Sequence, residues 1–369
     1  MTRTEELEIK LARTRSLMSS MKLDAVYLKR QDDFAWLTCG GQSYLGWGEM
    51  GNCGLLVTDE GQYAVTNLIE YPRMIEEEHL EDMGFKILAA VWFENDFESE
   101  TVRRLVPSLN IGTDYNAPFG GKNIAGEIKK LRLSLTESEQ DRLRKVGELA
   151  SLAMEEACAT LRPGDRELDA VKRIADHLFD CGMEFTSLMC AADDRLLKYR
   201  HAIPTENRML RRVQVGGNMR KWGLTVCMTR YVNFVPVTEE LRSQYRLNQR
   251  IDLALMTNTH PGCSYQVPLL AARKIYDENG LENEFEKHHQ GGPIGYANRD
   301  YRVDFNLNDL IHDDQAFCWN PSITGTKSED TILVHKEGFE FITRPYVFPK
   351  VDIEFEGRKY TRADILEKC

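Results

Sequence analysis

Apolar residues recur at helical spacing in two long stretches of the chain. Residues 2–21 place five apolar side chains among charged ones, which predicts an amphipathic helix. The same spacing runs through the stretch that follows Thr136, where the predicted helix extends to Leu161. Both stretches are expected to cover a core with one face and to meet water with the other.

Short apolar runs alternate with charged segments in the first third of the chain. Strands are predicted at residues 24–28, 54–57, 63–66 and 85–91, and a charged helix at residues 71–83. This alternation is typical of an α/β domain, which we expect to end near residue 130.

A helix start separates this domain from the rest of the chain. Thr136 and Glu139 have the spacing of a capping box, in which the hydroxyl accepts from a free amide and the carboxylate reaches back. We therefore place the boundary at residues 131–136, with an N-terminal domain at 1–130 and a second domain at 136–369.

The second domain shows an internal repeat. Its first long helix is followed by Pro163-Gly164 and by a second helix that stops at Gly182. A later helix, starting near Thr238, is followed by Pro261-Gly262 and by another helix that stops near Gly280. The distance from Pro-Gly to the terminating glycine is 18 residues in both copies. This indicates a duplicated helix pair with strands after each copy, and a functional site is expected between the copies.

Composition and charge exclude several classes of function. Lys plus Arg is 47 and Asp plus Glu is 58, which gives a net charge of −11 and argues against binding to nucleic acid or an anionic membrane. The longest apolar run, residues 87–93, is too short to span a bilayer. The charged start of the chain is unlike a signal peptide. The nine cysteines are scattered without a Cys-x-x-Cys pair, so a cytoplasmic protein with reduced thiols is expected.

Chemically distinctive residues gather in four segments of the second domain. These are residues 198–208 with His201, residues 212–232 with Cys227-Met-Thr-Arg230, residues 288–299 with His288-His289 and Gly291-Gly292, and residues 319–331 with Asn320-Pro321 and Glu329-Asp330.

In this order, the four segments resemble the creatinase / aminopeptidase P / methionine aminopeptidase family. The resemblance covers essentially the whole chain. It implies an α+β protein, with a creatinase-type N-terminal α/β domain followed by a pita-bread catalytic domain that has an internal pseudo-twofold repeat. Members of this family often dimerise, so a homodimer is expected.

The metal ligands of the family's peptidases are largely missing. Those enzymes hold two divalent ions with two Asp, one His and two Glu, whose bridging carboxylates offset the repulsion between the ions. The stretch from Arg211 to Thr238, where both Asp are expected, contains no Asp or Glu, and Cys227 stands where the second would be. Asn320 replaces the first Glu, and only Glu329 survives. The resemblance therefore predicts no bound metal and no cofactor.

Creatinase uses the same fold without metal, and several residues resemble its site. His201 matches the creatinase catalytic base, in a segment that continues with Pro, Thr and Asn-Arg. Counted from His288, a glycine falls at +3, Tyr296 at +8 and Arg299 at +11, as in creatinase, where the arginine binds the substrate carboxylate. This spacing favours His288 as the equivalent histidine, with His289 as its rival. Glu329 matches a creatinase Glu that binds the guanidinium of the substrate. The second such Glu of creatinase has no counterpart here, which argues against creatine as substrate.

Several of these residues also have a structural interpretation. Arg299 lies among charged neighbours and could form a surface ion pair, while Asn320 could contact substrate or support the fold. Cys227 lies in an apolar strand and is expected to be a buried small hydrophobe. Glu329 precedes the strand-like run 331–334, a position that suits a pocket floor.

The leading expectation is metal-independent, creatinase-like hydrolysis of a C–N bond in a small metabolite that bears a carboxylate, of the amidinohydrolase or amidohydrolase type. The alternatives are an Xaa-Pro dipeptidase with one atypical metal, and a non-catalytic binding protein. The expected catalytic residues are His201 and Glu329, and the expected substrate-binding residues are His288, His289, Tyr296, Arg299 and Asn320. The only other partner expected is a second copy of the chain.

Overall fold

The chain folds into two compact units. The computed structural model describes residues 1–46 and 48–369. One unit spans Met1–Glu139 and the other spans Gln140–Cys369. Among the described residues, no helix combines the length and the apolar character needed to cross a bilayer.

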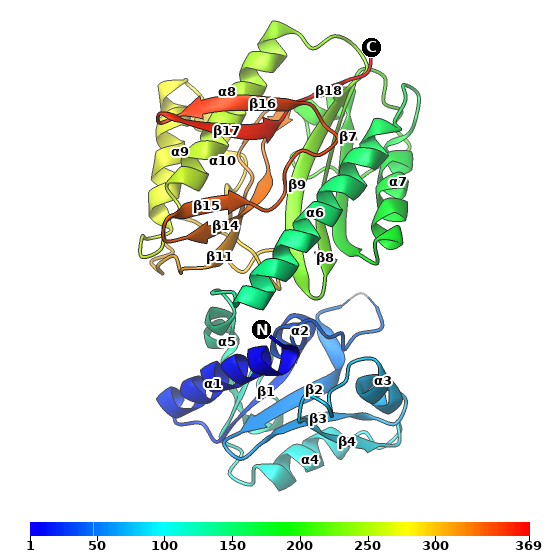
Figure 1. Cartoon of the computed structure of the whole chain (residues 1–369), viewed down its shortest axis with the longest axis vertical. Helices are drawn as coiled ribbons and strands as arrows, with labels where there is room; N and C mark the ends of the chain where they lie inside the picture. The colour runs from blue at the N-terminus through cyan, green and yellow to red at the C-terminus, as the bar shows by residue number, and fades with distance from the viewer. Residues whose placement is uncertain (47) are drawn as a thin grey trace. The chain divides into compact units, whose positions relative to one another are not determined.

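The N-terminal unit is an α/β domain built around a six-stranded sheet (Figure 1). Its sheet order is β4-β3-β2-β1-β5-β6. The elements are α1 (Arg3–Met21), β1 (Ala25–Arg30), α2 (Gln31–Leu37), β2 (Met50–Thr58), β3 (Gln62–Asn67), α3 (Tyr71–Glu76), β4 (Lys86–Ala90), α4 (Phe97–Leu105), β5 (Ile111–Thr113), β6 (Lys122–Asn123) and α5 (Ala125–Leu131). The first predicted helix and all four predicted strands are confirmed. The helix predicted at residues 71–83 is wrong in length, because α3 ends at Glu76.

The long helix α6 (Glu137–Ala159) starts in the last residues of the first unit and continues into the second, and its start follows the predicted capping box. The amide of Glu139 donates to Thr136 Oγ1 at 3.3 Å, and the amide of Thr136 donates to Glu139 Oε2 at 2.7 Å. Two otherwise free amides are satisfied in this way, which explains why the helix begins here.

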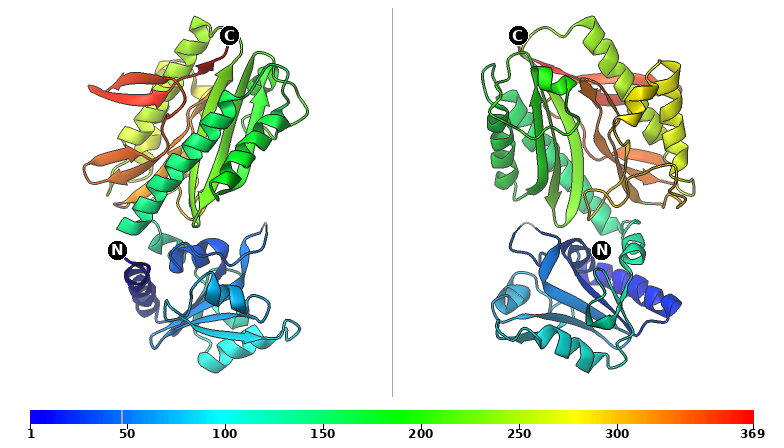
Figure 2. Two further views of the ribbon diagram at one scale, coloured as in Figure 1. Left: turned by 45° about the vertical axis from the view of Figure 1, so that its right-hand side comes forward. Right: turned by 180° about the vertical axis from the view of Figure 1, so that it is seen from behind.

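The two halves of this unit follow the same plan of two helices and then strands (Figure 2). The first half contains α6, α7 (Glu167–Asp180), β7 (Glu184–Ala192), β8 (Arg212–Lys221) and β9 (Leu224–Asn233). The second half contains α8 (Glu239–Thr257), α9 (Gln266–Glu278), α10 (Glu282–Glu286), β10 (Gly291–Pro293), β11 (Gln315–Trp319), β12 (Ser322–Ile323), β13 (Thr326–Lys327), β14 (Asp330–His335) and β15 (Gly338–Phe341). The chain closes with β16 (Lys350–Phe355), β17 (Arg358–Ala363) and β18 (Leu366–Glu367). The expected helix pairs and their ends are confirmed.

Each half contributes its own sheet. The first has the order β18-β9-β8-β7 and the second has the order β10-β11-β14-β15. Every residue of β9 is buried, which is expected for a central strand covered on both faces. The largest core cluster packs α8 and α9 against the second sheet, with Phe317 and Trp319 of β11 fully buried. The two sheets thus form a rigid frame for the segments that carry polar side chains.

Candidate active site

His201 lies on a loop that is fixed at both ends by one buried carboxylate. Glu167, at the start of α7, is 0% exposed. Its oxygens accept from the amide of Ala192 at 2.9 Å and, across the loop, from the amide and hydroxyl of Thr205 at 3.0 and 2.9 Å. Arg195 also pairs with Glu167. Because both ends of the loop share one anchor, the position of His201 is set by the fold.

The neighbour of His201 ties the same loop to the second half of the unit. Arg200 pairs with Glu284 of α10 and donates to Thr324 Oγ1 at 3.0 Å. Although burial raises the pKa of Glu284, hydrogen bonds from Lys287, Arg200 and Thr324 lower it to about 2. Glu284 is therefore charged at neutral pH and holds the loop beside the second sheet.

The two central strands of the first sheet bring uncharged side chains to the site. Asn218 on β8 lies directly opposite Cys227 on β9. Asn218 Nδ2 donates to Ser187 Oγ on β7 at 2.9 Å. Cys227 is 0% exposed, so its predicted role as a buried hydrophobe is confirmed.

Glu329 is buried and already paired with a cation. Lys327 Nζ lies 2.8 Å from Glu329 Oε2, and the hydroxyl of Thr229 donates to the same oxygen at 2.6 Å. Burial raises the pKa of Glu329, but the charge of Lys327 and these hydrogen bonds lower it more, so the group stays ionised. A cationic substrate group would have to compete with Lys327 for this carboxylate.

Arg299 points into the unit and, among the described residues, forms no ion pair. Its Nη1 donates to the carbonyl oxygen of Gly292 at 2.9 Å and to that of Cys318. Within the described part of the chain, its Nε and Nη2 have no hydrogen-bond partner. The guanidinium is thus held on one side by the backbone and is free to bind a ligand on the other.

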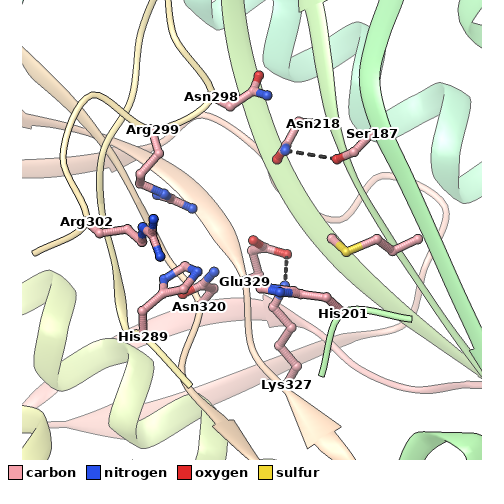
Figure 3. A pocket seen from close by; sticks show the side chains of 11 residues that line it. Ser187, His201, Asn218, His289, Asn298, Arg299, Arg302, Asn320, Lys327 and Glu329 are labelled. Atoms are coloured by element: carbon pink, nitrogen blue, oxygen red, sulfur yellow. Dashed lines mark hydrogen bonds and ion pairs between the residues drawn. The ribbon is translucent and has the colours of Figure 1, made fainter. Parts of the chain in front are cut away.

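These segments line one pocket of about 370 Å³ (Figure 3). The lining side chains are Ser187, Met189, His201, Asn218, His289, Asn298, Arg299, Arg302, Asn320, Lys327 and Glu329. Five residues expected from the sequence, His201, His289, Arg299, Asn320 and Glu329, are among them. Residues from both halves of the repeat contribute.

The remaining two expected residues lie outside the pocket lining. Tyr296 is 1% exposed and is not part of the lining. His288 is 8% exposed, and its Nε2 lies 3.0 Å from His201 Nε2, so one imidazole donates and the other accepts. His289 therefore faces the pocket, while His288 contacts the expected base from behind.

The imidazoles favour their neutral forms. Burial, followed by the charge of Lys327, lowers the pKa of His288 to about 2. Burial, followed by the charge of Arg299, lowers the pKa of His289 to about 4. The pKa of His201 is lowered by burial and Lys327, and Glu329 offsets part of this effect. The positive charge of the pocket therefore resides on lysine and arginine.

Comparison with known proteins identifies the family. Residues 141–336, more than half of the chain, match the model of metallopeptidase family M24. The chain belongs to metallopeptidase family M24. The family resemblance and fold class expected from the sequence are thereby confirmed.

Relatives and solved structures agree with this assignment. An uncharacterized peptidase of Staphylococcus aureus strain MW2 is 24% identical over 252 residues, which cover 65% of this chain and 69% of that protein. An Xaa-Pro dipeptidase from Bacillus anthracis has a TM-score of 0.76 at 18% identity, covering 98% of this chain and all of that one. A prolidase from Pyrococcus horikoshii OT3 has a TM-score of 0.75 at 17% identity, covering 91% and 98% of the two chains. The structural matches show a shared fold, and together with the family they favour a peptidase over a creatinase-type hydrolase.

The donor set of this M24 member does not fit a carboxylate-bridged pair of metal ions. The facing positions on β8 and β9 hold Asn218 and Cys227, and the position before Pro321 holds Asn320. Glu329 is the one carboxylate in the pocket lining, and Lys327 already neutralises it. With two ions and one available carboxylate, the repulsion between the ions would be uncompensated.

The three histidines are a different set of donors. His201, His288 and His289 each offer one ring nitrogen, and these atoms lie within 4.8 Å of one another. Neutral imidazole is a good ligand for zinc and related metals. The donor type therefore suits one ion, although the neighbouring lysine and arginines oppose added positive charge.

Sequence reasoning missed several residues of the pocket. Lys327 and Arg302 are cations, and Asn218 is a polar residue that follows two glycines in β8. Lys327 precedes Glu329 by two positions, a spacing that places side chains on the same face of an extended segment. That spacing and the polar position in β8 were the available signals.

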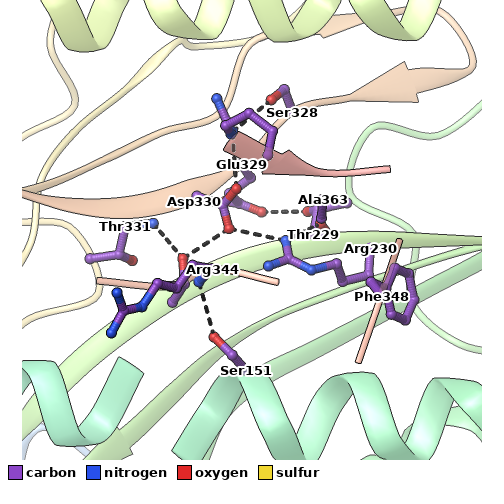
Figure 4. Close-up of polar contacts among 12 residues, drawn as sticks. Ser151, Thr229, Arg230, Ser328, Glu329, Asp330, Thr331, Arg344, Phe348 and Ala363 are labelled. Atoms are coloured by element: carbon purple, nitrogen blue, oxygen red, sulfur yellow. Dashed lines mark hydrogen bonds and ion pairs between the residues drawn. The ribbon is translucent and has the colours of Figure 1, made fainter. Parts of the chain in front are cut away.

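A chain of buried charges supports the site from behind, and Figure 4 shows its Arg230–Asp330 pair. Arg230, next to Thr229, pairs with Glu155 of α6 at 2.7 Å and with Asp330 at 3.0 Å. Arg362 of β17 continues the chain, because it pairs with Asp330 at 3.0 Å and with Asp252 of α8 at 2.7 Å. The network joins α6, β9, β14, β17 and α8, and so fixes the strands that present Thr229 and Glu329.

Proposed function

We propose that this M24 member hydrolyses a C–N bond in a small peptide or peptide-like substrate that bears a free carboxylate. The observation that carries the proposal is one pocket that combines an accessible histidine, His201, with a guanidinium, Arg299, whose unused N–H groups face the cavity. The peptide nature of the substrate is supported by the family and by its peptidase relatives. Its size is supported by the volume of about 370 Å³.

Arg299 is proposed to bind the substrate carboxylate. A guanidinium offers parallel N–H donors that match the two oxygens of a carboxylate, and a backbone-held guanidinium loses little entropy on binding. This contact would orient the scissile bond relative to His201.

His201 is proposed to act as the general base. Its lowered pKa keeps the ring neutral at pH 7, so it can take a proton from an attacking water and return it to the leaving nitrogen. The contact with His288 Nε2 orients the ring. The chain's own residues thus supply both proton transfers.

Lys327 and Asn320 are proposed to stabilise the charge that develops on the substrate carbonyl oxygen. The ammonium is fixed by Glu329, so it is preorganised before the substrate arrives. In this proposal Glu329 holds Lys327, in place of the expected contact with a cationic substrate group. Asn320 lies beside it in the lining.

Hydrolysis of a substrate panel tests the proposal. Xaa-Pro dipeptides come first, because a similar structure is an Xaa-Pro dipeptidase. Other dipeptides and N-acyl amino acids follow, each with its C-terminally amidated analogue. Acid substrates are expected to be cleaved and their amides to be cleaved poorly. Equal cleavage of acids and amides would contradict the role of Arg299, and no cleavage of any member would favour a binding protein.

A dipeptidase with one metal ion is the second candidate. The histidine cluster favours it, because three neutral imidazoles could hold one ion, which would supply a Lewis acid. Elemental analysis of the purified chain separates the two candidates. The leading proposal expects far less than one equivalent of Mn, Fe, Co or Zn and activity that survives a chelator. Stoichiometric metal, together with loss of activity on chelation, would select the second candidate.

A further inference from the structure

The pocket contains two arginines without a carboxylate partner. Arg299 and Arg302 both line the cavity. Within the described residues, neither forms an ion pair within 4.0 Å, whereas Lys327 is neutralised by Glu329. The nearby carboxylate of Asp304 accepts instead from the amides of Asn306 and Leu307. Two positive charges are thus left for a ligand to balance.

The position of the two arginines indicates two binding points. Figure 3 shows both guanidinium groups on the same wall of the pocket, near His289. Arg299 is held by the carbonyls of Gly292 and Cys318. Arg302 makes no hydrogen bond within the described chain and can adjust to a ligand. A fixed cation and an adjustable one can each bind a separate acidic group.

Away from the arginines, the lining carries Ser187 and Asn218, which are uncharged, and the Lys327–Glu329 pair, whose charges offset each other. Asn218 Nδ2 donates to Ser187 Oγ at 2.9 Å. Hydroxyl and amide groups suit the neutral, amide-bearing part of a ligand. The division between a cationic wall and a neutral polar wall matches a molecule whose charges lie toward one side.

We propose that the substrate carries two acidic groups, one bound by Arg299 and the other by Arg302. This inference rests on the proposed function, because the bound molecule is a substrate only if the chain hydrolyses it. The chemical class is a small dicarboxylate with an amide bond, such as a dipeptide or an N-acyl amino acid that contains an acidic side chain.

Calorimetric titration of the full chain tests the charge preference without turnover. The probes are the diacids succinate, glutarate and adipate, the monoacids with the same numbers of carbons, and inorganic phosphate. The best diacid is expected to bind at least about tenfold more tightly than its monoacid, because a second charge-assisted contact is formed. Equal affinities for diacid and monoacid would overturn the proposal.

The variant Arg302→Gln tests whether Arg302 binds the second acidic group. This exposed position is expected to tolerate the change, and the variant should bind the diacid about as weakly as the monoacid while keeping its monoacid affinity. Arg358→Gln is the matched control, because it removes the same charge from the exposed turn that begins β17. If both variants lower diacid affinity equally, a general charge effect would replace the proposal.

Titrations with phosphate and with zinc ion separate competing explanations. Phosphate that binds as tightly as the best diacid would overturn the two-group proposal in favour of one compact dianion. Zinc ion is titrated alone, and the diacids are titrated with and without it. If zinc binds and the diacids bind only in its presence, a metal on the histidines would replace the two-group proposal. A chain that prefers diacids but cleaves no amide would contradict the proposed function only, whereas equal cleavage of acidic and neutral side chains would contradict this inference only.

Discussion

The ammonium of Lys327 lies 2.8 Å from Glu329 Oε2, and both side chains are only 4% exposed. A buried ion pair is weak evidence for stability, because both ions lose their hydration. In this chain the ion pair fixes one positive charge in the pocket lining, and it occupies the carboxylate that a metal would need.

Removing one partner of this pair should destabilise the chain. Lys327→Met leaves the carboxylate of Glu329 buried without its cation, which should raise the pKa of Glu329 and lower the free energy of unfolding by roughly 3–5 kcal/mol. Urea unfolding at pH 7 measures the loss. The double variant Lys327→Met/Glu329→Gln removes the uncompensated charge and should recover much of it. If the single and double variants are equally unstable, lost packing of the lysine stem is the cause.

His201→Ala should separate catalysis from binding. Loss of the general base should lower kcat by about 10²–10⁴-fold with little change in KM. Steady-state kinetics on the best substrate measures this, and His260→Ala serves as a control on an exposed histidine outside the pocket lining. A variant that keeps full kcat would show that another group moves the proton.

Arg299→Lys should weaken binding instead. The substitution keeps the charge but loses the parallel N–H donors and the contacts to the carbonyls of Gly292 and Cys318. Affinity for a carboxylate ligand should fall roughly 10–100-fold, because one charge-assisted bond of a bidentate pair is lost. Direct titration is the measurement. Unchanged affinity would place the carboxylate elsewhere in the pocket.

The histidine cluster should make stability depend on pH. His288 and His289 have pKa values of about 2 and about 4 in the folded chain, below the ordinary value of 6.5. Between about pH 4 and 6.5 the unfolded chain therefore binds more protons, so the free energy of unfolding falls as the pH is lowered through this range. His289→Gln should reduce this slope relative to the unsubstituted chain. An unchanged slope in His289→Gln would show that other groups cause the dependence.

The sequence predicted the order of the helices and the repeat better than the length of each helix. The capping box at Thr136 and the two Pro-Gly pairs mark helix starts and ends, and α6, α8 and the repeat are found where they indicated. The helix predicted at residues 71–83 ends early at α3, since charge alone does not extend a helix without packing.

The candidate site was predictable only in part. His201, His289, Arg299, Asn320 and Glu329 were expected and line one pocket. The choice between His288 and His289 depends on which ring turns outward, which spacing does not determine. The pairing of Lys327 with Glu329 depends on burial and on the exact path of the segment between β13 and β14. Such contacts arise from tertiary packing and leave little trace in sequence.

Adjacent residues in β9 and at the start of β14 turn to opposite sides. Thr229 and Glu329 turn toward the pocket, whereas Arg230 and Asp330 turn toward the helices and complete the buried charge network. Pocket-lining residues other than the Lys327–Glu329 pair can therefore be changed while the framework is kept. A library that varies only those positions should yield mostly folded proteins, and one that varies the residues of the buried charge network should not. Alternation along a strand thus makes this scaffold a practical starting point for new hydrolases.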